Sequence, residues 1–272
     1  GKGIDRDRSQ ARPAGFARQL RRKVVIEEEI EIQAADGTTD GFLFRPEKAE
    51  RRPGVLHLTD IGGVREANRG MARRLAEQGY TVLLPNVFYR TARTPVWDFP
   101  RNLAEERSKK RMAELVGPLT PEAVARDASA YVDFLAAQPA VSAGGMGVIG
   151  YCFTGAMAVR TAAARPDRIA AAASFHGGGL WTDRPDSPHL SLPKIAARLY
   201  FGHADEDRSM PAEAIERFER ALAAWGGRYE SATYSGAHHG WTVPDSAAFH
   251  PAQAERAFQK LTETLAGLQQ EL

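Results

Sequence analysis

The sequence has 272 residues, of which 43% are hydrophobic and 26% are charged, values that are ordinary for a soluble globular protein. No apolar run approaches the roughly 20 residues that a membrane-spanning helix needs, so we expect no membrane association. The single cysteine excludes an internal disulfide and fits a reducing compartment, which predicts a cytoplasmic protein.

Charge is distributed unevenly along the chain. Residues 1–23 contain eight Lys or Arg and two Asp, which leaves 28 basic and 32 acidic side chains in residues 24–272. The opening segment lacks the apolar core of a signal peptide, and we expect a flexible basic arm at 1–23 in front of one domain at 24–272. Because that domain is mildly acidic, the sequence disfavours a nucleic-acid partner.

Short β-rich segments are followed along the chain by helical ones. The first two strands flank the turn Ala-Asp-Gly at 35–37, as a hairpin would. Further strands are predicted at 54–59, 80–85, 146–151, 169–176, 197–202 and 228–234, and helices at 65–79, 121–138, 153–164, 211–226 and 251–268. The central strands are nearly continuous apolar runs, which is typical of parallel strands covered on both faces. The pattern predicts an α/β protein, a three-layer α/β/α sandwich with a mostly parallel eight-stranded sheet.

One long connection, at 86–120, carries no predicted element. Connections of that length in a compact domain are often functional loops or lids.

The only cysteine, Cys152, follows a predicted strand directly and begins a helix. It stands in the pattern Gly150-x-Cys152-x-x-Gly155, which is a nucleophile elbow with sulfur in place of hydroxyl. Gly150 leaves room for the tight turn, and the helix N-terminus favours a thiolate. In such sheets, ligands bind beyond the carboxyl ends of the strands. We therefore predict a nucleophile, and the alternative is a packed, inert cysteine.

A nucleophile of this kind needs a base, and the base needs an orienting carboxylate. The loops after the last two strands supply them in the order acid, then histidine. His239 is the predicted base, with His238 as the adjacent alternative. Asp207 is the predicted acid, with Asp205 as the alternative, because only one of them can face the imidazole.

Other residues are expected to complete the site. The backbone N–H groups of Ile61 and Phe153 are predicted to form the oxyanion hole. Asp60 is expected to contact the substrate, the resting thiol or the imidazole, although a turn-capping role fits it equally. Trp181 and Trp97 are candidate apolar walls for the substrate, or plain core residues.

Five segments together resemble the dienelactone hydrolase family of α/β hydrolases, and the resemblance runs from about residue 24 to the C-terminus. They are TDIGG at 59–63, GYCFTG at 150–155, FHGGGL at 175–180, DRSMP at 207–211 and GAHHGW at 236–241. The resemblance implies an α/β-hydrolase fold and a triad of Cys152, His239 and Asp207, with Asp60 in the place of an acidic residue after the third strand. It implies opening of enol-lactones or cleavage of related esters without a cofactor, so the expected partner is a small-molecule ester or lactone.

The sequence departs from the family pattern at three places. Thr154 stands where family members often have glycine, and Asp60 where glutamate is typical. Residues 242–243 are Thr-Val where the type enzyme has a substrate-binding arginine, and Arg107 or Arg111 is a candidate replacement for its other arginine. These departures weaken the expectation of the family's original substrate more than that of the reaction type.

Several alternatives stay open at this point. One is a general carboxylesterase or thioesterase, and another is a non-catalytic binding or redox-sensing module whose cysteine is only oxidised. No metal is expected, because the spacing of the nearby histidines matches no compact ligand pattern; these are His176, His189 and His203. The sequence does not indicate the oligomeric state.

Overall fold

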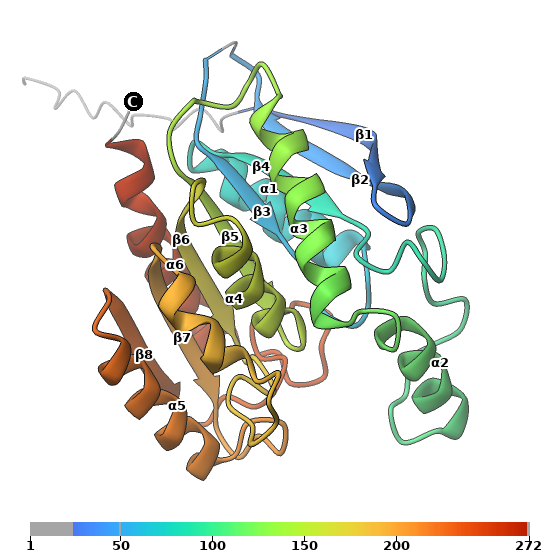
Figure 1. Ribbon diagram of the computed structural model, residues 1–272. Helices are drawn as coiled ribbons and strands as arrows, with labels where there is room; N and C mark the ends of the chain where they lie inside the picture. Colours follow the sequence, from blue (N-terminus) through green and yellow to red (C-terminus); the bar gives the residue numbers. More distant parts are fainter. Residues whose placement is uncertain (1–23, 49, 271–272) are drawn as a thin grey trace, which may run out of the picture.

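The computed structural model describes residues 24–48 and 50–270, so the predicted arm at 1–23 lies outside the described residues. One eight-stranded sheet forms the middle layer, in the order β1-β2-β4-β3-β5-β6-β7-β8 (Figure 1). Its strands are β1 (Val25–Ala34), β2 (Gly37–Pro46), β3 (Gly54–His57), β4 (Thr81–Pro85), β5 (Met146–Tyr151), β6 (Ile169–Phe175), β7 (Arg198–Ala204) and β8 (Tyr229–Tyr234).

The sheet is antiparallel only at its N-terminal edge. β1 and β2 form the predicted hairpin, with Ala34 opposite Gly37, and β2 is also antiparallel to β4. All remaining strand pairs are parallel. The predicted α/β class with a mostly parallel sheet is therefore confirmed.

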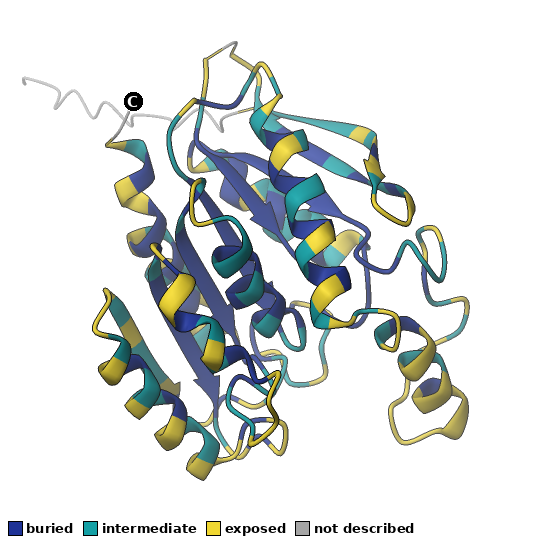
Figure 2. Cartoon of the chain, viewed as in Figure 1, coloured by how far each residue is buried: buried dark blue, intermediate teal, exposed yellow. Residues whose placement is uncertain are grey.

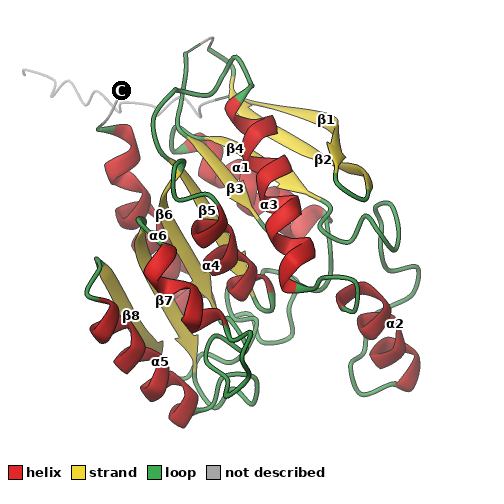
Figure 3. Cartoon of the chain, in the orientation of Figure 1, coloured by secondary structure: helices red, strands yellow, loops and turns green. Residues whose placement is uncertain are grey.

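Helices cover both faces of the sheet, which gives the three expected layers (Figure 3). α3 (Pro121–Ala136), α4 (Thr154–Ala164) and α5 (Ala212–Trp225) lie on one face, and α1 (Glu66–Glu77) and α6 (Pro251–Gln269) on the other. A short 3₁₀ helix follows β6 at Pro188–Lys194. All five predicted helices are present.

Each face of the sheet has its own apolar core. Tyr131, Phe201 and Phe218 belong to the core on the α3–α5 side, and Leu75 and Leu261 to the core on the α1–α6 side. The central strands are buried along their whole length (Figure 2), as their continuous apolar sequences require.

The long connection at 86–120 contains a helix that the sequence analysis missed. α2 (Glu106–Val116) extends to the side of the sheet (Figure 1). Six of its eleven residues are charged, so the helical period of its few apolar residues is hard to recognise in the sequence. Its last two turns nevertheless reach the candidate site described below.

The carboxyl ends of the parallel strands meet at one edge of the sheet. The loops after β3, β5, β7 and β8 begin at this edge, and they carry residues 58–63, Cys152, Asp207 and His239. Within the two described ranges, no helix has both the length and the hydrophobicity needed to cross a bilayer.

Candidate active site

Cys152 lies in a strained turn between β5 and α4. Its φ is +62°, in the left-handed region that residues with a β-carbon rarely adopt. The turn is so tight that a β-carbon at Gly150 would overlap the backbone of Thr154 and lie 2.7 Å from Gly155 Cα. The Cys152 N–H points to the Phe175 carbonyl oxygen at 3.1 Å. Glycine at position 150 is therefore a steric requirement of the elbow.

Thr154, which stands where the resemblance led us to expect glycine, reinforces the same turn. Its buried hydroxyl accepts a hydrogen bond from the Tyr151 N–H and donates one to the Tyr151 carbonyl, each at 2.7 Å. The side chain therefore closes the turn locally and does not enter the substrate space.

Three loops bring a sulfur, an imidazole and a carboxylate into one hydrogen-bonded chain. Cys152 Sγ lies 2.8 Å from His239 Nε2, and His239 Nδ1 lies 2.7 Å from Asp207 Oδ2. The other oxygen of Asp207 accepts hydrogen bonds from the Ser209 N–H at 2.9 Å and the Ser209 hydroxyl at 2.7 Å. Ser209, which was not singled out from the sequence, therefore fixes the carboxylate that orients the imidazole.

The ionisation states of Asp207, His239 and Cys152 depend on one another. Burial opposes ionisation of Asp207, but hydrogen bonds from His239 and Ser209 outweigh it and lower the pKa of the carboxyl group. Burial also opposes a charged ring at His239, yet its hydrogen bonds to Asp207 and Cys152 raise its pKa to about 10. The imidazole is therefore positively charged at neutral pH when the sulfur beside it is a thiolate.

The alternative acid and base left open by the sequence, Asp205 and His238, are not part of the hydrogen-bonded series Cys152–His239–Asp207. Asp205 Oδ2 accepts the Gly236 N–H at 3.1 Å, and His238 Nδ1 lies 3.1 Å from the Asp205 carbonyl oxygen. The hydrogen-bonded positions are therefore Asp207 and His239.

His176 bonds to the backbone of Cys152. Burial, together with the charge of His239, keeps the pKa of His176 well below its usual value, so the ring is neutral. Its Nδ1 shares the Cys152 N–H with the Phe175 carbonyl oxygen, each 3.1 Å from the nitrogen. Because Nδ1 accepts, the ring proton is on Nε2, where it is donated to Thr242 Oγ1 at 2.8 Å. From the sequence, this histidine was a candidate only for a metal ligand. Within the described ranges, no group of three His, Cys, Asp or Glu side chains is arranged to hold a metal ion.

Two backbone N–H groups are available beside the sulfur. Within the described part of the chain, neither the Ile61 nor the Phe153 N–H has a hydrogen-bond acceptor, and both residues line the same cavity as Cys152. The Ile61 carbonyl accepts a 2.9 Å hydrogen bond from Trp97 Nε1, which fixes the orientation of this peptide. Trp97 thus stabilises the loop at 58–63 through a bond to its carbonyl side.

The cavity at Cys152 has a volume of about 440 Å³ and one apolar wall. Leu103, Met112 and Val116 supply this wall from α2 and the loop before it, together with Phe153. Trp181, which the sequence suggested as a substrate contact, is not among the residues that line this cavity. Its ring instead stacks on His189 and lies under the Arg217 guanidinium, which hold it against α5 away from the cavity.

Arg101 is the one arginine that lines the active-site cavity. It forms no ion pair among the described residues, although its charge helps to lower the pKa of Asp245 and its guanidinium carbon lies 5.8 Å from the centre of the Trp97 ring. A side chain at Gly62 would overlap its guanidinium group, which therefore lies close to the loop at 58–63 after β3, here called the oxyanion loop. The arginines named from the sequence are engaged elsewhere. Arg107 binds Glu105 at 3.0 Å, and Arg111 donates to the Val96 carbonyl. Arg101 was missed because only the path of the loop before α2 brings it here.

Asp60 lines the cavity but does not bond to the sulfur or the imidazole. Its two oxygens accept hydrogen bonds from the Arg65 guanidinium at 2.6 and 3.0 Å, and Arg65 also binds Asp245. The carboxylate therefore joins the oxyanion loop to the loop after β8.

Comparisons with known proteins show which family this sequence resembles over most of its length. A family model described as the dienelactone hydrolase family matches residues 39–268. The carboxymethylenebutenolidase of Rhodococcus opacus is 29% identical over 212 residues, which cover 77% of this chain and 79% of that protein. That of Pseudomonas putida is 26% identical over 245 residues, or 90% and 98% of the two chains.

Solved structures support the fold. The dienelactone hydrolase of Anabaena variabilis aligns with a TM-score of 0.66 at 18% identity, covering 90% of this chain and 99% of that one. A dienelactone hydrolase-like promiscuous phosphotriesterase from metagenomic libraries aligns with a TM-score of 0.75 at 20% identity, covering 90% and 98%.

Proposed function

The chain belongs to the dienelactone hydrolase family, and from that premise we propose that it hydrolyses a carboxylic ester or lactone through an acyl-enzyme on Cys152. The observation that carries this proposal is the hydrogen-bonded chain from the sulfur through His239 to Asp207. A structural cysteine has no need of a charged imidazole held by a buried carboxylate.

In the first half of the reaction, the Cys152 thiolate attacks the carbonyl carbon. The negative charge that develops on the carbonyl oxygen is received by the N–H groups of Ile61 and Phe153. The tetrahedral intermediate then collapses, the C–O bond to the leaving group breaks, and protonated His239 donates its Nε2 proton to the departing oxygen. With a lactone, the leaving group stays attached through the rest of the ring.

In the second half, neutral His239 takes a proton from water, and the hydroxide attacks the thioester carbon. The C–S bond breaks, the carboxylic acid product leaves, and the thiolate and imidazolium are restored. Asp207 keeps the ring in one orientation and stabilises its charge in both halves, so it is a positioning residue.

The cavity favours a substrate that combines an apolar body with a carboxylate. Leu103, Met112 and Val116 offer the apolar surface, and Arg101 offers an unpaired cation beside the oxyanion loop. A carboxylate that binds this guanidinium would hold the reacting carbonyl near the sulfur. In this proposal Arg101 binds the substrate carboxylate, the role for which the sequence suggested Arg107 or Arg111.

The test measures hydrolysis of a lactone, an aryl ester and a thioester by the native protein and by Cys152→Ala. We expect the variant to have the same unfolding temperature as the native protein and to lose turnover by at least ~10⁴-fold. Acid-quenched samples of the native protein with 4-nitrophenyl acetate should show one acetyl group on Cys152 by mass spectrometry. An undiminished rate in the variant would end the proposal.

The redox-sensing and binding alternatives are separated by alkylation. A thiolate paired with His239 should react rapidly with iodoacetamide at neutral pH, in parallel with loss of activity. A slow reaction that follows the titration of an ordinary thiol would favour the alternatives.

A further inference from the structure

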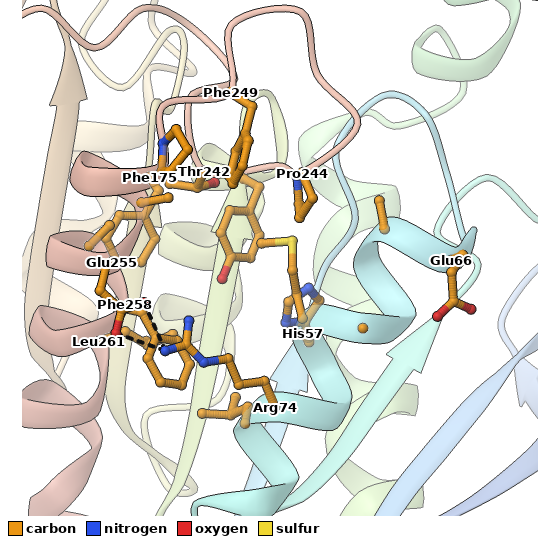
Figure 4. Close-up of a pocket in the computed structure, with 18 residues that line it drawn as sticks. His57, Glu66, Arg74, Phe175, Thr242, Pro244, Phe249, Glu255, Phe258 and Leu261 are labelled. Carbon is orange, nitrogen blue, oxygen red and sulfur yellow. Dashed lines mark hydrogen bonds and ion pairs between the residues drawn. The ribbon is translucent and has the colours of Figure 1, made fainter.

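A second cavity, of about 530 Å³, lies between α1 and α6 beside Tyr151 and Phe175, the last residues of β5 and β6 (Figure 4). Figure 4 shows Pro244 and Phe249 at one end and Arg74 and Phe258 at the other, with His57 between them. Its volume is within the range of small-molecule sites. Apolar side chains form most of its surface, among them Met71, Leu75, Tyr151, Phe175, Phe258 and Leu261.

His57 is the polar group buried in this apolar wall. The residue is 1% exposed at the end of β3, and neither ring nitrogen has a hydrogen-bond partner among the described residues. Its ring packs against Tyr151, with 5.0 Å between centroids. Because buried polar groups are almost always hydrogen-bonded, an unpaired imidazole in the lining of a cavity is a place where a ligand could supply the partner.

The protonation state of His57 defines what that partner can be. Burial lowers its pKa to about 4 in spite of the charge of Asp60, so the ring is neutral at pH 7. A neutral imidazole has one N–H donor and one acceptor nitrogen. A hydroxyl group, which both donates and accepts, can satisfy either of them.

The remaining charges disfavour an anionic ligand. Arg74 is the one cation in the lining, and it is already bound to both Glu255 oxygens at 2.8 Å and lies 3.7 Å from the centre of the Phe258 ring. Glu66 and Glu255 make the lining net negative. A carboxylate or phosphate would therefore enter without an available counter-charge.

We propose that this second cavity binds a neutral, mainly apolar molecule with a single hydroxyl group, of the size of a fused-ring aromatic alcohol. Its ring system lies among Met71, Tyr151 and Phe258, and its hydroxyl group bonds to His57. This site does not depend on the proposed hydrolysis. It is separated from the active-site cavity by a wall that contains Thr242, His176 and Phe175, and neither the sulfur nor His239 nor Asp207 lines it.

The test uses protein that has been carbamidomethylated at Cys152, its only cysteine, so that binding beside the nucleophile is blocked. Calorimetry compares 2-naphthol with naphthalene, which lacks the hydroxyl group. Gly70→Leu fills the cavity, because Gly70 lines it and a β-carbon there meets nothing within 4 Å. Gly267→Leu is the matched control: it is the same change at an exposed α6 position that is equally open and lies outside the cavity.

We expect one 2-naphthol per chain, with naphthalene bound at least ~10-fold more weakly because it leaves His57 without a partner. His57→Leu should abolish this preference while remaining at least as heat-stable, since it removes two unsatisfied nitrogens. Gly70→Leu should weaken both ligands at least ~10-fold, and Gly267→Leu should leave them unchanged. The proposal fails if 2-naphthol does not bind at millimolar concentration, if Gly70→Leu has no effect, or if His57→Leu preserves the preference.

Discussion

The tightness of the elbow makes Gly150→Ala a demanding test of how the active site is built. The added methyl group would lie closer than 3.0 Å to three backbone atoms, two of Thr154 and one of Gly155. Backbone cannot rotate away as a side chain can, so the cost belongs at the upper end of the range for overpacking, about 3 kcal/mol. For a domain of this size that corresponds to a fall of about 6–12 °C in Tm. Turnover should fall at least ~100-fold, because the sulfur moves relative to His239.

The assay combines thermal unfolding followed by circular dichroism with ester hydrolysis. Gly267→Ala is the matched control, because its new methyl group meets nothing within 4 Å in α6 and should stabilise the helix by about 0.5–1 kcal/mol. The same substitution is therefore expected to act with opposite signs at the two positions. A Gly150→Ala protein with the same Tm as the native protein and with full activity would refute the steric reasoning.

Two further predictions concern the charged groups of the site. Asp207→Asn should lower kcat by about 10³–10⁴-fold without unfolding the protein, whereas Asp205→Asn should leave kcat unchanged. Because Asp207 helps to hold the pKa of His239 at about 10, its loss disfavours the protonated ring and should shift the alkaline limb of the kcat profile to lower pH; an unshifted limb would contradict the pairing. Arg101→Gln should raise KM about 10–100-fold for esters that carry a carboxylate and not for neutral esters. Arg107→Gln is the control substitution and should leave KM unchanged for both. Equal effects on both ester types would show that Arg101 does not bind the carboxylate.

Much of the architecture could be predicted because it is encoded locally. Continuous apolar runs identified the central strands, and the amphipathic period identified five helices. The elbow was also readable, since a strand, a glycine, a cysteine and a helix adjoin in the chain. α2 was missed because its surface is mostly charged and its few apolar residues pack beside the sheet.

The carboxylate and the imidazole that join the sulfur in one hydrogen-bonded chain could not be chosen from the sequence, because the choice depends on backbone conformation. Glu206 has a φ of +53°, and this left-handed residue turns the chain so that Asp205 and Asp207 face different partners. Which of two carboxylates two residues apart bonds to the imidazole therefore depends on the local backbone conformation, to which the sequence gives little clue.

The sequence by itself determined the order of strands, helices and reactive residues, because those features follow from the period of hydrophobic residues and from neighbours in the chain. Only the tertiary structure decided which cation enters the active-site cavity, that Trp181 stays outside it, and that His57 faces a second cavity without a partner. Those outcomes depend on where distant loops and helices pack. Side-chain direction and burial are properties of the assembled layers, not of any short segment.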